Sequence, residues 1–334
     1  MFYILLYINY YFCMFIAIFD AGSTSTRLHI YDITDDYLKE VSCHKHNEPL
    51  NIHTVDNTMI NLLENIINLK NNTKLNKNCK NKLNCNISIG FYATAGIRED
   101  PNKTQIMDKV KSYINDAIHD DSNKQYIADV KILTGKEEAM GLVDAFEYFN
   151  PSADNYMLMD MGGKSTQIVY KVNGNIEIDL WNTGITTKKR ILFDSLLDDN
   201  LNNSFLDNTL NNKVNLLPNK NDRNIKNITN KNKNTLYGNI YAFSSFADSL
   251  KEFNGKSYKD IEASINDKCN TNEYNKHNDI SKYNACNDLN YINYFISDIL
   301  KINKNATINI FHHTDDLYIS WPIGKALQIY RSII

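Results

Sequence analysis

Two segments of the sequence each place an acidic side chain beside a run of glycine and hydroxyl residues. "FDAGSTSTR" contains Asp20, and "LMDMGGKSTQ" repeats the arrangement around Asp160, about 140 residues later. An Asp at the end of a strand, followed by Gly, Ser and Thr, sets a carboxylate beside a tight turn whose backbone N–H groups can surround phosphate. One such turn is often only a hairpin. Two matching turns predict a polyphosphate clamp, with Asp20 and Asp160 holding a hydrated divalent cation.

Two further segments suit the same site. "GFYATAGIRED" runs from a strand into Thr94 and small residues, which suit a close approach of backbone to a ligand. "ILTGKEEAMGLVDAF" sets Glu137 and Glu138 at the start of a helix. A favourable interaction with the helix dipole accounts for one of these acids. The other carboxylate is a candidate general base for water.

The sequence pattern predicts that strands and helices alternate along the chain, and that the same order of elements begins again after Pro151. We therefore expect an α/β fold with an N-terminal domain over 15–151 and a C-terminal domain over 152–320, the latter with an exposed Asn-rich insertion near 211–235. The expected strands are 15–20, 26–33, 37–44, 86–93, 126–133, 156–160, 166–172, 175–180 and 306–311. The expected helices are 54–70, 103–119, 136–149, 186–200, 258–268, 287–301 and 321–332.

Composition limits the classes of partner. The chain has 334 residues, 43% of them hydrophobic, and a formal charge of −3. It can bury one large core or two ordinary ones. It has no long basic block and no basic stripe with interleaved aromatics, so a nucleic-acid partner is disfavoured.

The six cysteines leave two interpretations open. Cys79 with Cys85 and Cys269 with Cys286 are close enough in sequence for local disulfides, as in an oxidising compartment. Free thiols in a cytosolic protein are the alternative, because spacing does not fix connectivity. The spacings fit no zinc pattern.

The N-terminal segment 1–14 is apolar and has the length of a signal-peptide core, although it lacks a basic flank. We expect a secretory-pathway lumen or extracellular location, with the segment acting as a signal peptide or a membrane anchor. A buried extra strand is the alternative.

The ordered motifs "DAGSTSTR", "ATAGIR", "GKEEA", "DMGGKSTQI" and "YAFSSFADSL" resemble the conserved regions of the apyrase, or nucleoside triphosphate diphosphohydrolase, family. "CNDLNYINYFI" and "ISWPIGKAL" resemble its C-terminal segments. The resemblance implies a two-domain actin/Hsp70-like (ribonuclease H-like) fold with an active-site cleft between the domains. It also implies that the last helix, 321–334, joins the first domain. The implied activity is hydrolysis of terminal phosphates of nucleoside tri- or diphosphates with Ca²⁺ or Mg²⁺.

The resemblance also assigns roles to individual residues by motif position. Those in contact with phosphate, metal or the attacking water are Asp20 and Asp160 (metal, through water), Ser23, Thr24, Thr94 and Gly163 (phosphate), Glu138 (activation of water), and Ser165 and Gln167 (orientation of water). Phe246 is the candidate for stacking on the base.

Departures from the family pattern keep alternatives open. Ala139 follows the catalytic acid where the family usually has Gly, and Lys164 replaces a small residue of the phosphate loop. Lys164 either contacts a phosphate or extends its ammonium into solvent. We therefore keep two alternatives to the nucleoside phosphatase: an exopolyphosphatase-like hydrolase, and a degenerate nucleotide-binding module without turnover.

Overall fold

The structure is a computed structural model, and it describes residues 14–34, 37–71, 87–119, 128–186, 239–269, 280–311, 313–314 and 317–333. The chain divides into two compact units. The first comprises Met1–Ala93, Ile97–Ile132 and Lys325–Ile334, and the second comprises Thr94–Gly96 and Leu133–Gly324.

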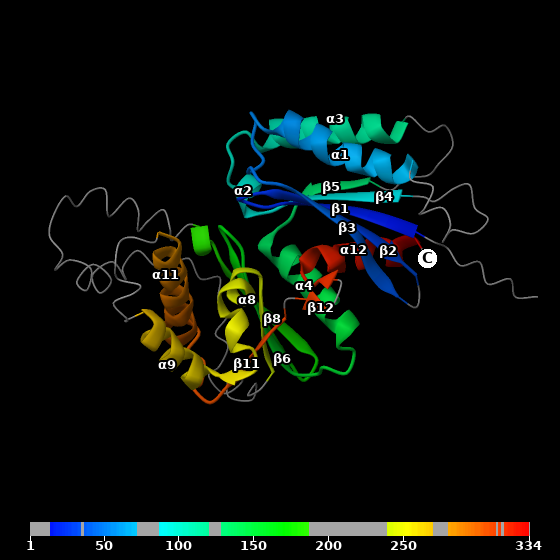
Figure 1. Ribbon diagram of the computed structural model, residues 1–334. Helices are drawn as coiled ribbons and strands as arrows, with labels where there is room; N and C mark the ends of the chain where they lie inside the picture. The colour runs from blue at the N-terminus through cyan, green and yellow to red at the C-terminus, as the bar shows by residue number, and fades with distance from the viewer. Residues whose placement is uncertain are drawn as a thin grey trace, which may run out of the picture. The chain divides into compact units, whose positions relative to one another are not determined.

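The first unit is built on a five-stranded sheet in the order β3-β2-β1-β4-β5 (Figure 1). Pairs β1–β2 and β2–β3 are antiparallel, whereas β1–β4 and β4–β5 are parallel. Its elements are β1 (Met14–Ala21), β2 (Thr26–Ile33), β3 (Leu38–His46), α1 (Val55–Asn71), β4 (Ile87–Ala93), α3 (Lys103–His119) and β5 (Ala128–Ile132), with the short α2 (Ala95–Arg98) after β4.

Alternation along β1 divides its residues between the two faces of this sheet. Phe15, Ala17 and Phe19 belong to the apolar core that the sheet forms with α1 and α3. These two helices lie side by side over one face of the sheet in Figure 1. Asp20 therefore projects from the opposite face, away from this core.

The second unit is built on a six-stranded sheet in the order β10-β11-β9-β6-β7-β8. Its elements are α4 (Gly135–Phe149), β6 (Tyr156–Met161), β7 (Thr166–Val172), β8 (Asn175–Trp181), β9 (Ile240–Phe243), α8 (Ser244–Leu250), η4 (Lys251–Phe253), β10 (Lys256–Ser257), α9 (Tyr258–Cys269), α11 (Ile280–Tyr294), the π-helical η5 (Phe295–Ile299), β11 (Thr307–Ile310), β12 (His313–Thr314), β13 (Leu317–Tyr318) and α12 (Trp321–Ile333), which continues into the first unit.

The two sheets repeat one topology. Strands β8-β7-β6-β9-β11 of the second sheet follow the same antiparallel and parallel pairings as β3-β2-β1-β4-β5 of the first. In both, an antiparallel hairpin supplies the central strand, and this hairpin contains the Asp and the Gly-Ser-Thr run. The repeated sequence motif thus corresponds to a repeated structural unit.

Helix α4 groups with the second unit, although the expected domain boundary followed it at residue 151. The reason is aromatic packing: the Phe146 ring lies 4.7 Å, centroid to centroid, from both Tyr156 and Tyr241, and 5.6 Å from Phe311. Its apolar side therefore covers the second sheet. Only Lys325–Ile334, part of the C-terminal helix, groups with the first unit.

Most expected elements are confirmed to within a few residues. The helix expected over 287–301 differs, because α11 begins at Ile280 and gives way to a π-helical turn at Phe295. The N-terminal residues 1–13, most of the expected helix 186–200, the insertion near 211–235 and the pair Cys79 and Cys85 lie outside the described residues.

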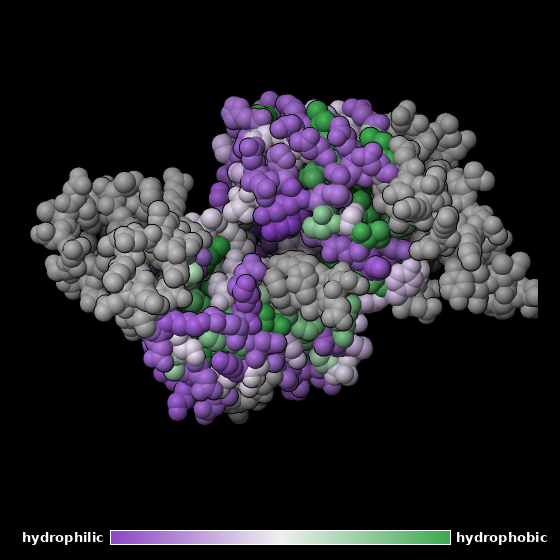
Figure 2. Space-filling model, viewed as in Figure 1, coloured by the Kyte–Doolittle hydropathy of each residue, from purple (hydrophilic) through white to green (hydrophobic). Residues whose placement is uncertain are grey.

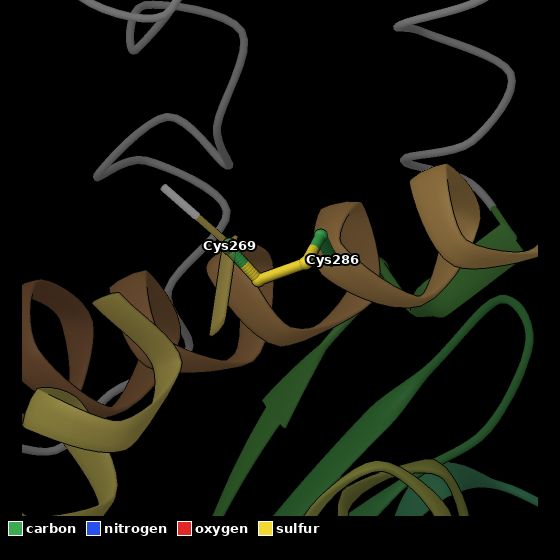
Figure 3. Close-up of a disulfide and its surroundings, with 2 residues drawn as sticks. All are labelled: Cys269 and Cys286. Atoms are coloured by element: carbon green, nitrogen blue, oxygen red, sulfur yellow. A yellow bond between two sulfur atoms is a disulfide. The ribbon is translucent and has the colours of Figure 1, made fainter. Parts of the chain in front are cut away.

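The second expected cysteine pair is confirmed. Cys269 at the end of α9 and Cys286 on α11 form a disulfide, with Cα atoms 5.5 Å apart (Figure 3). Both residues are buried in the apolar core that α8, α9 and α11 form against the second sheet. The disulfide therefore joins two helices that also pack together.

Among the described residues, no helix is both long and apolar enough to cross a membrane. On the face shown in Figure 2, hydrophobic residues are scattered among hydrophilic ones. Exposed large apolar side chains include Ile60 and Ile67 on α1. Single exposed apolar side chains are common at the surface of folded proteins.

Candidate active site

The β1–β2 hairpin forms the first half-site. Asp20 lies directly opposite Arg27 in the strand register, and its carboxylate is 3.6 Å from the Arg27 guanidinium. The Gly22 N–H donates to the Ser25 carbonyl at 3.0 Å, which closes the turn. Ser23 is half-buried and Thr24 is exposed at the tip. The hairpin thus presents hydroxyl groups beside a buried carboxylate.

The β6–β7 hairpin repeats this construction. Asp160 lies opposite Gln167, at the register position that Arg27 occupies in the first hairpin. The Gly162 N–H donates to the Ser165 carbonyl at 2.9 Å, as Gly22 does to Ser25. The second half-site therefore carries an amide where the first carries a guanidinium.

Ser165 and Gln167 are both buried and contact each other. The Gln167 amide nitrogen donates to the Ser165 hydroxyl at 3.1 Å. The Gln167 Oε1 atom is buried and has no hydrogen-bond partner among the described residues. A buried acceptor of this kind is costly unless something satisfies it, such as an ordered water.

The two half-sites offer the oxygen ligands that Ca²⁺ and Mg²⁺ prefer. Asp20 and Asp160 are 8% and 5% exposed. Burial raises the pKa of Asp20, and the positive charges of Arg27 and His29 only partly offset this effect. A nearby cation would stabilise such a carboxylate. Within the second half-site, a water bound to a cation beside Asp160 could donate to Gln167 Oε1. The residues of each half-site, taken by itself, therefore fit a hydrated divalent cation.

A segment that the sequence analysis did not single out braces the second hairpin. The N–H groups of Ile185 and Thr186 donate to the carbonyls of Gly162 and Gly163, at 3.1 and 2.9 Å. The Thr186 hydroxyl also donates to the Gly163 carbonyl, at 2.6 Å. The Thr166 hydroxyl donates to the Thr183 carbonyl at 2.7 Å. Residues 183–186 thus hold the turn from one side.

Close packing makes glycine necessary within this brace. A Cβ atom on Gly184 would lie 2.3 Å from the Gly162 oxygen and 2.7 Å from the carbonyl atoms of Gly163. Both distances are far below ordinary contact. The "NTGIT" stretch that carries Gly184 contains no charged or strongly nucleophilic group, so residue types alone gave no signal for it.

The brace also determines where the backbone N–H groups of the turn point. In a trans peptide, the N–H lies opposite the C=O of the same unit, and the described residues contain no cis peptide bond. Because the carbonyls of Gly162 and Gly163 point toward 185–186, the N–H groups of Gly163 and Lys164 point to the opposite side. Two such successive N–H groups suit an anion.

Helix α4 separates the roles of its two neighbouring acids. Glu137 forms a capping box with Thr134: the Thr134 N–H donates to Glu137 Oε2 at 2.8 Å, and the Glu137 N–H donates to the Thr134 hydroxyl at 3.2 Å. Glu138 is buried, with 6% of its surface exposed. Glu137 is thus committed to the helix end, which leaves Glu138 as the candidate base.

Other expected site residues fall in different environments. Thr94 is buried between β4 and α2, and it groups with the second unit. Lys164 is half-buried at the tip of the second turn. Phe246 is fully buried in the core of the second unit, with its ring 5.9 Å from that of Phe295. This burial argues against the expected stacking of Phe246 on a nucleotide base.

Comparison with known proteins agrees with these motifs. The model of the GDA1/CD39 (nucleoside phosphatase) family matches residues 13–206, more than half of the chain. The chain therefore belongs to the GDA1/CD39 nucleoside phosphatase family, as the motifs predicted. Membership makes it a hydrolase of the nucleotide phosphatase type that acts on phosphoanhydrides, in a family whose enzymes typically use divalent metal ions. A search of curated proteins finds no match.

Solved structures confirm the fold class. An exopolyphosphatase from Cytophaga hutchinsonii is similar with a TM-score of 0.58 at 15% identity, covering 96% of this chain and 98% of the other. A Ppx/GppA family member from Aquifex aeolicus gives a TM-score of 0.56 at 15% identity, with the same coverage. At such identities the similarity establishes the fold alone, the two-domain actin/Hsp70-like arrangement.

Proposed function

We propose that this protein hydrolyses the terminal phosphate of nucleoside tri- or diphosphates. The observation that carries the proposal is the repeated hairpin. Each unit holds one Asp at the same register position, beside a turn closed by the same N–H to carbonyl bond. Such turns suit phosphate oxygens. Family membership supports a phosphoanhydride as the substrate.

The reaction we propose is in-line attack of water on the terminal phosphorus. Buried Glu138 accepts a proton from this water, while Ser165 and Gln167 orient it through their polar groups. The bond from the terminal phosphorus to the bridging oxygen breaks, the nucleoside di- or monophosphate leaves with that oxygen, and inorganic phosphate is released. The hydroxyls of Ser23, Thr24 and Thr94 would bind phosphate oxygens, together with the N–H groups at Gly163 and Lys164.

Asp20 and Asp160 would hold Ca²⁺ or Mg²⁺ through water molecules. When bound, the ion neutralises charge on the phosphate oxygens and on the leaving group. The proposal requires both half-sites to act on the same substrate. A substitution at either Asp should therefore weaken the dependence of the rate on metal concentration.

A phosphate-release screen tests this function. The full chain is assayed with ATP, ADP, GDP, UDP and inorganic polyphosphate, each with Ca²⁺, Mg²⁺ or EDTA. We expect metal-dependent release of phosphate from nucleotides and none in EDTA. Undiminished turnover in EDTA would contradict the roles of Asp20 and Asp160.

A matched pair of variants tests the base. Glu138→Gln removes the carboxylate while keeping the size of the side chain, and we expect kcat to fall by about 10²–10⁴ with nucleotide affinity nearly unchanged. Glu137→Gln serves as the control, because the Glu137 carboxylate caps the start of the helix. The opposite ranking would move the base to Glu137.

An exopolyphosphatase-like activity remains the second candidate. The burial of Phe246 favours it, because a fully buried ring offers no face on which a nucleotide base could stack. Turnover of polyphosphate in preference to every nucleotide would establish that alternative. Nucleotide binding without phosphate release under any metal condition would instead establish a degenerate binding module.

We also propose that the protein matures in the secretory pathway and is retained there or secreted. The disulfide between Cys269 and Cys286 and the apolar segment 1–14 support this location. Attachment to a membrane through that segment is a further part of the proposal. Mass spectrometry of non-reduced peptides from freshly isolated protein tests the compartment, and free thiols at both positions would oppose it.

A further inference from the structure

We propose that His29, Glu40 and Cys43 form a binding site for a zinc-like transition-metal ion in the first unit. Their ligand atoms, one from each side chain, all lie within 4.8 Å of one another. No other group of three or more such side chains meets that distance in the described part of the chain. The proposal does not depend on nucleotide hydrolysis, and the residues are not those of the two hairpin turns.

The strand register explains how the three side chains come together. His29 on β2 lies directly opposite Cys43 on β3. The pairing then shifts, because Ile30 lies opposite Ser42, whereas the next residue, Tyr31, lies opposite Glu40. The register therefore contains one extra residue on β3, a β-bulge.

The bulge determines which face Glu40 occupies. In a regular strand, residues three positions apart project from opposite faces. The extra residue cancels this alternation, so Glu40 and Cys43 project from the same face as His29. Bulges often redirect a side chain next to a functional site. Without the bulge, the cluster would lack its carboxylate.

Neighbouring groups hold the central histidine in place. The His29 Nδ1 atom lies 2.7 Å from Glu40 Oε1. The His29 ring is 2% exposed and lies parallel to the Tyr31 ring, with centroids 6.0 Å apart. A fixed imidazole next to a carboxylate is a common arrangement in metal sites. The position of this ligand is therefore set before an ion arrives.

The Tyr31 hydroxyl supplies an independent sign of a missing ligand. It is fully buried and has no hydrogen-bond partner among the described residues. Tyr31 lies directly opposite Glu40 in the strand register, and its ring is parallel to that of His29, which places this side chain beside the cluster. A water bound to a metal ion there could donate a hydrogen bond to this hydroxyl oxygen.

The ligand set matches zinc. Zn²⁺ is bound in proteins by cysteine sulfur, histidine nitrogen and carboxylate oxygen, and three protein ligands leave a fourth position for water. One thiolate and one carboxylate balance the charge of a divalent ion when the imidazole is neutral. Metal ligands of these types bind in their deprotonated forms, so the affinity of such a site depends on pH. Cys43 is exposed on the edge strand β3, which gives the ion a path of entry.

Soft and hard ligands distinguish this site from the nucleotide site. Thiolate and imidazole favour zinc-like ions, whereas carboxylates and water suit Mg²⁺ and Ca²⁺. Excess Mg²⁺ would thus fill sites of the Asp20 and Asp160 type without occupying the cluster. This difference allows the cluster to be titrated alone.

The experiment uses metal-free full-length protein in excess Mg²⁺, titrated first with Co²⁺ and then with Zn²⁺. A cobalt–thiolate charge-transfer band in the near ultraviolet reports coordination by sulfur. We expect about one equivalent of Co²⁺ to produce the band and Zn²⁺ to abolish it. Cys43→Ser should remove the band and weaken Zn²⁺ binding by more than the 10–100-fold typical for loss of an outer-shell partner.

Two further variants sharpen the result. Glu40→Gln keeps the size of the side chain but removes its charge, so it should weaken Zn²⁺ binding while leaving the thiolate band at saturation. His44→Gln is the matched control. His44 follows Cys43 on β3, lies opposite Leu28 and projects from the other face of the sheet. This variant should bind both ions as the wild-type protein does.

A measurement on the wild-type chain avoids any dependence on how the variants fold. Zn²⁺ should slow alkylation of Cys43, followed by peptide mass spectrometry. The proposal is wrong if the wild-type protein gives no cobalt–thiolate band, if Cys43→Ser keeps it, or if Zn²⁺ leaves the alkylation of Cys43 unchanged. None of these outcomes bears on nucleotide hydrolysis, so the two proposals fail separately.

Discussion

Replacing Gly184 with alanine should impair the β6–β7 turn, which we propose binds phosphate, without removing any of the proposed catalytic groups. The new Cβ atom would lie 2.3 Å from the Gly162 oxygen, about 1 Å short of ordinary contact. The obstructing atoms belong to backbone, so either residues 183–186 or the turn itself must shift. Either movement breaks the bonds that Ile185 and Thr186 donate to the turn.

The size of the effect follows from that displacement. A shift of about 1 Å in a group that positions the substrate can cost about 10²-fold in rate. We therefore expect kcat/KM of Gly184→Ala to fall by about 100-fold, which corresponds to about 2.7 kcal/mol of lost transition-state stabilisation. Phosphate release from the best nucleotide of the screen is the assay, and circular dichroism verifies folding.

A second pair of variants tests residues 183–186 with a smaller perturbation, the loss of one hydrogen bond. Thr186→Val removes the hydroxyl that donates to the Gly163 carbonyl, whereas Thr186→Ser keeps it. We expect kcat to fall in the valine variant and to recover in the serine variant. A folded Gly184→Ala protein with wild-type kcat/KM would refute the reasoning, because it would show that the turn needs no support from 183–186.

Three other predictions concern the loop lysine, the disulfide and the buried histidine. Lys164→Ala should raise KM by less than about tenfold with kcat nearly unchanged, because a flexible ammonium at the tip strengthens ground-state binding; a tenfold fall in kcat, about 1.4 kcal/mol, would make it a transition-state group. Replacing Cys269 and Cys286 together by alanine should lower the free energy of unfolding by about 3 kcal/mol, because the disulfide closes a loop of 17 residues. The melting temperature of the second unit should then fall by about 6–12 °C. An unchanged melting temperature would show that the disulfide does not stabilise the unit. Burial lowers the pKa of His29, but its bonds to Cys43 and Glu40 more than compensate and raise it from 6.5 to about 9. The pKa of His29 is thus higher in the folded protein than in the unfolded chain. The protonated His29 therefore stabilises the fold fully below about pH 6.5, and this stabilisation is lost as the pH rises through about 9. Melting temperatures of metal-free protein between about pH 6 and about pH 10 should show that loss, and His29→Gln should reduce it.

Local sequence was sufficient to predict the hairpins and their repetition. A strand that ends in Asp20 or Asp160 and enters a Gly-Ser-Thr turn is specified by neighbouring residues, because strand alternation and turn formation act over a few positions. The same holds for the start of α4, where Thr134 and Glu137 satisfy each other's backbone groups. The prediction that the two cysteines Cys269 and Cys286 pair was confirmed, although spacing alone left it open.

Contacts between distant segments were beyond the reach of these patterns. Sequence motifs suggested that Phe246 contacts the base, but core packing against Phe295 buries its ring. The boundary expected at residue 151 ignored the aromatic face of α4, whose partners Tyr241 and Phe311 lie far along the chain. Side-chain packing, which no local pattern contains, decided both points.

The sequence by itself determined that this chain forms two similar α/β halves, each with a carboxylate beside a phosphate-type turn, because those features depend on residues within one hairpin. Only the tertiary structure revealed the brace at 183–186, since Gly184 matters through a close approach to the Gly162 oxygen rather than through its own chemistry. Only it brought Glu40 to the side of His29, because that placement depends on a one-residue shift in strand pairing. The sequence specifies which residues have side chains capable of chemistry. The distances between those side chains depend on core packing and on strand register, which the tertiary structure determines.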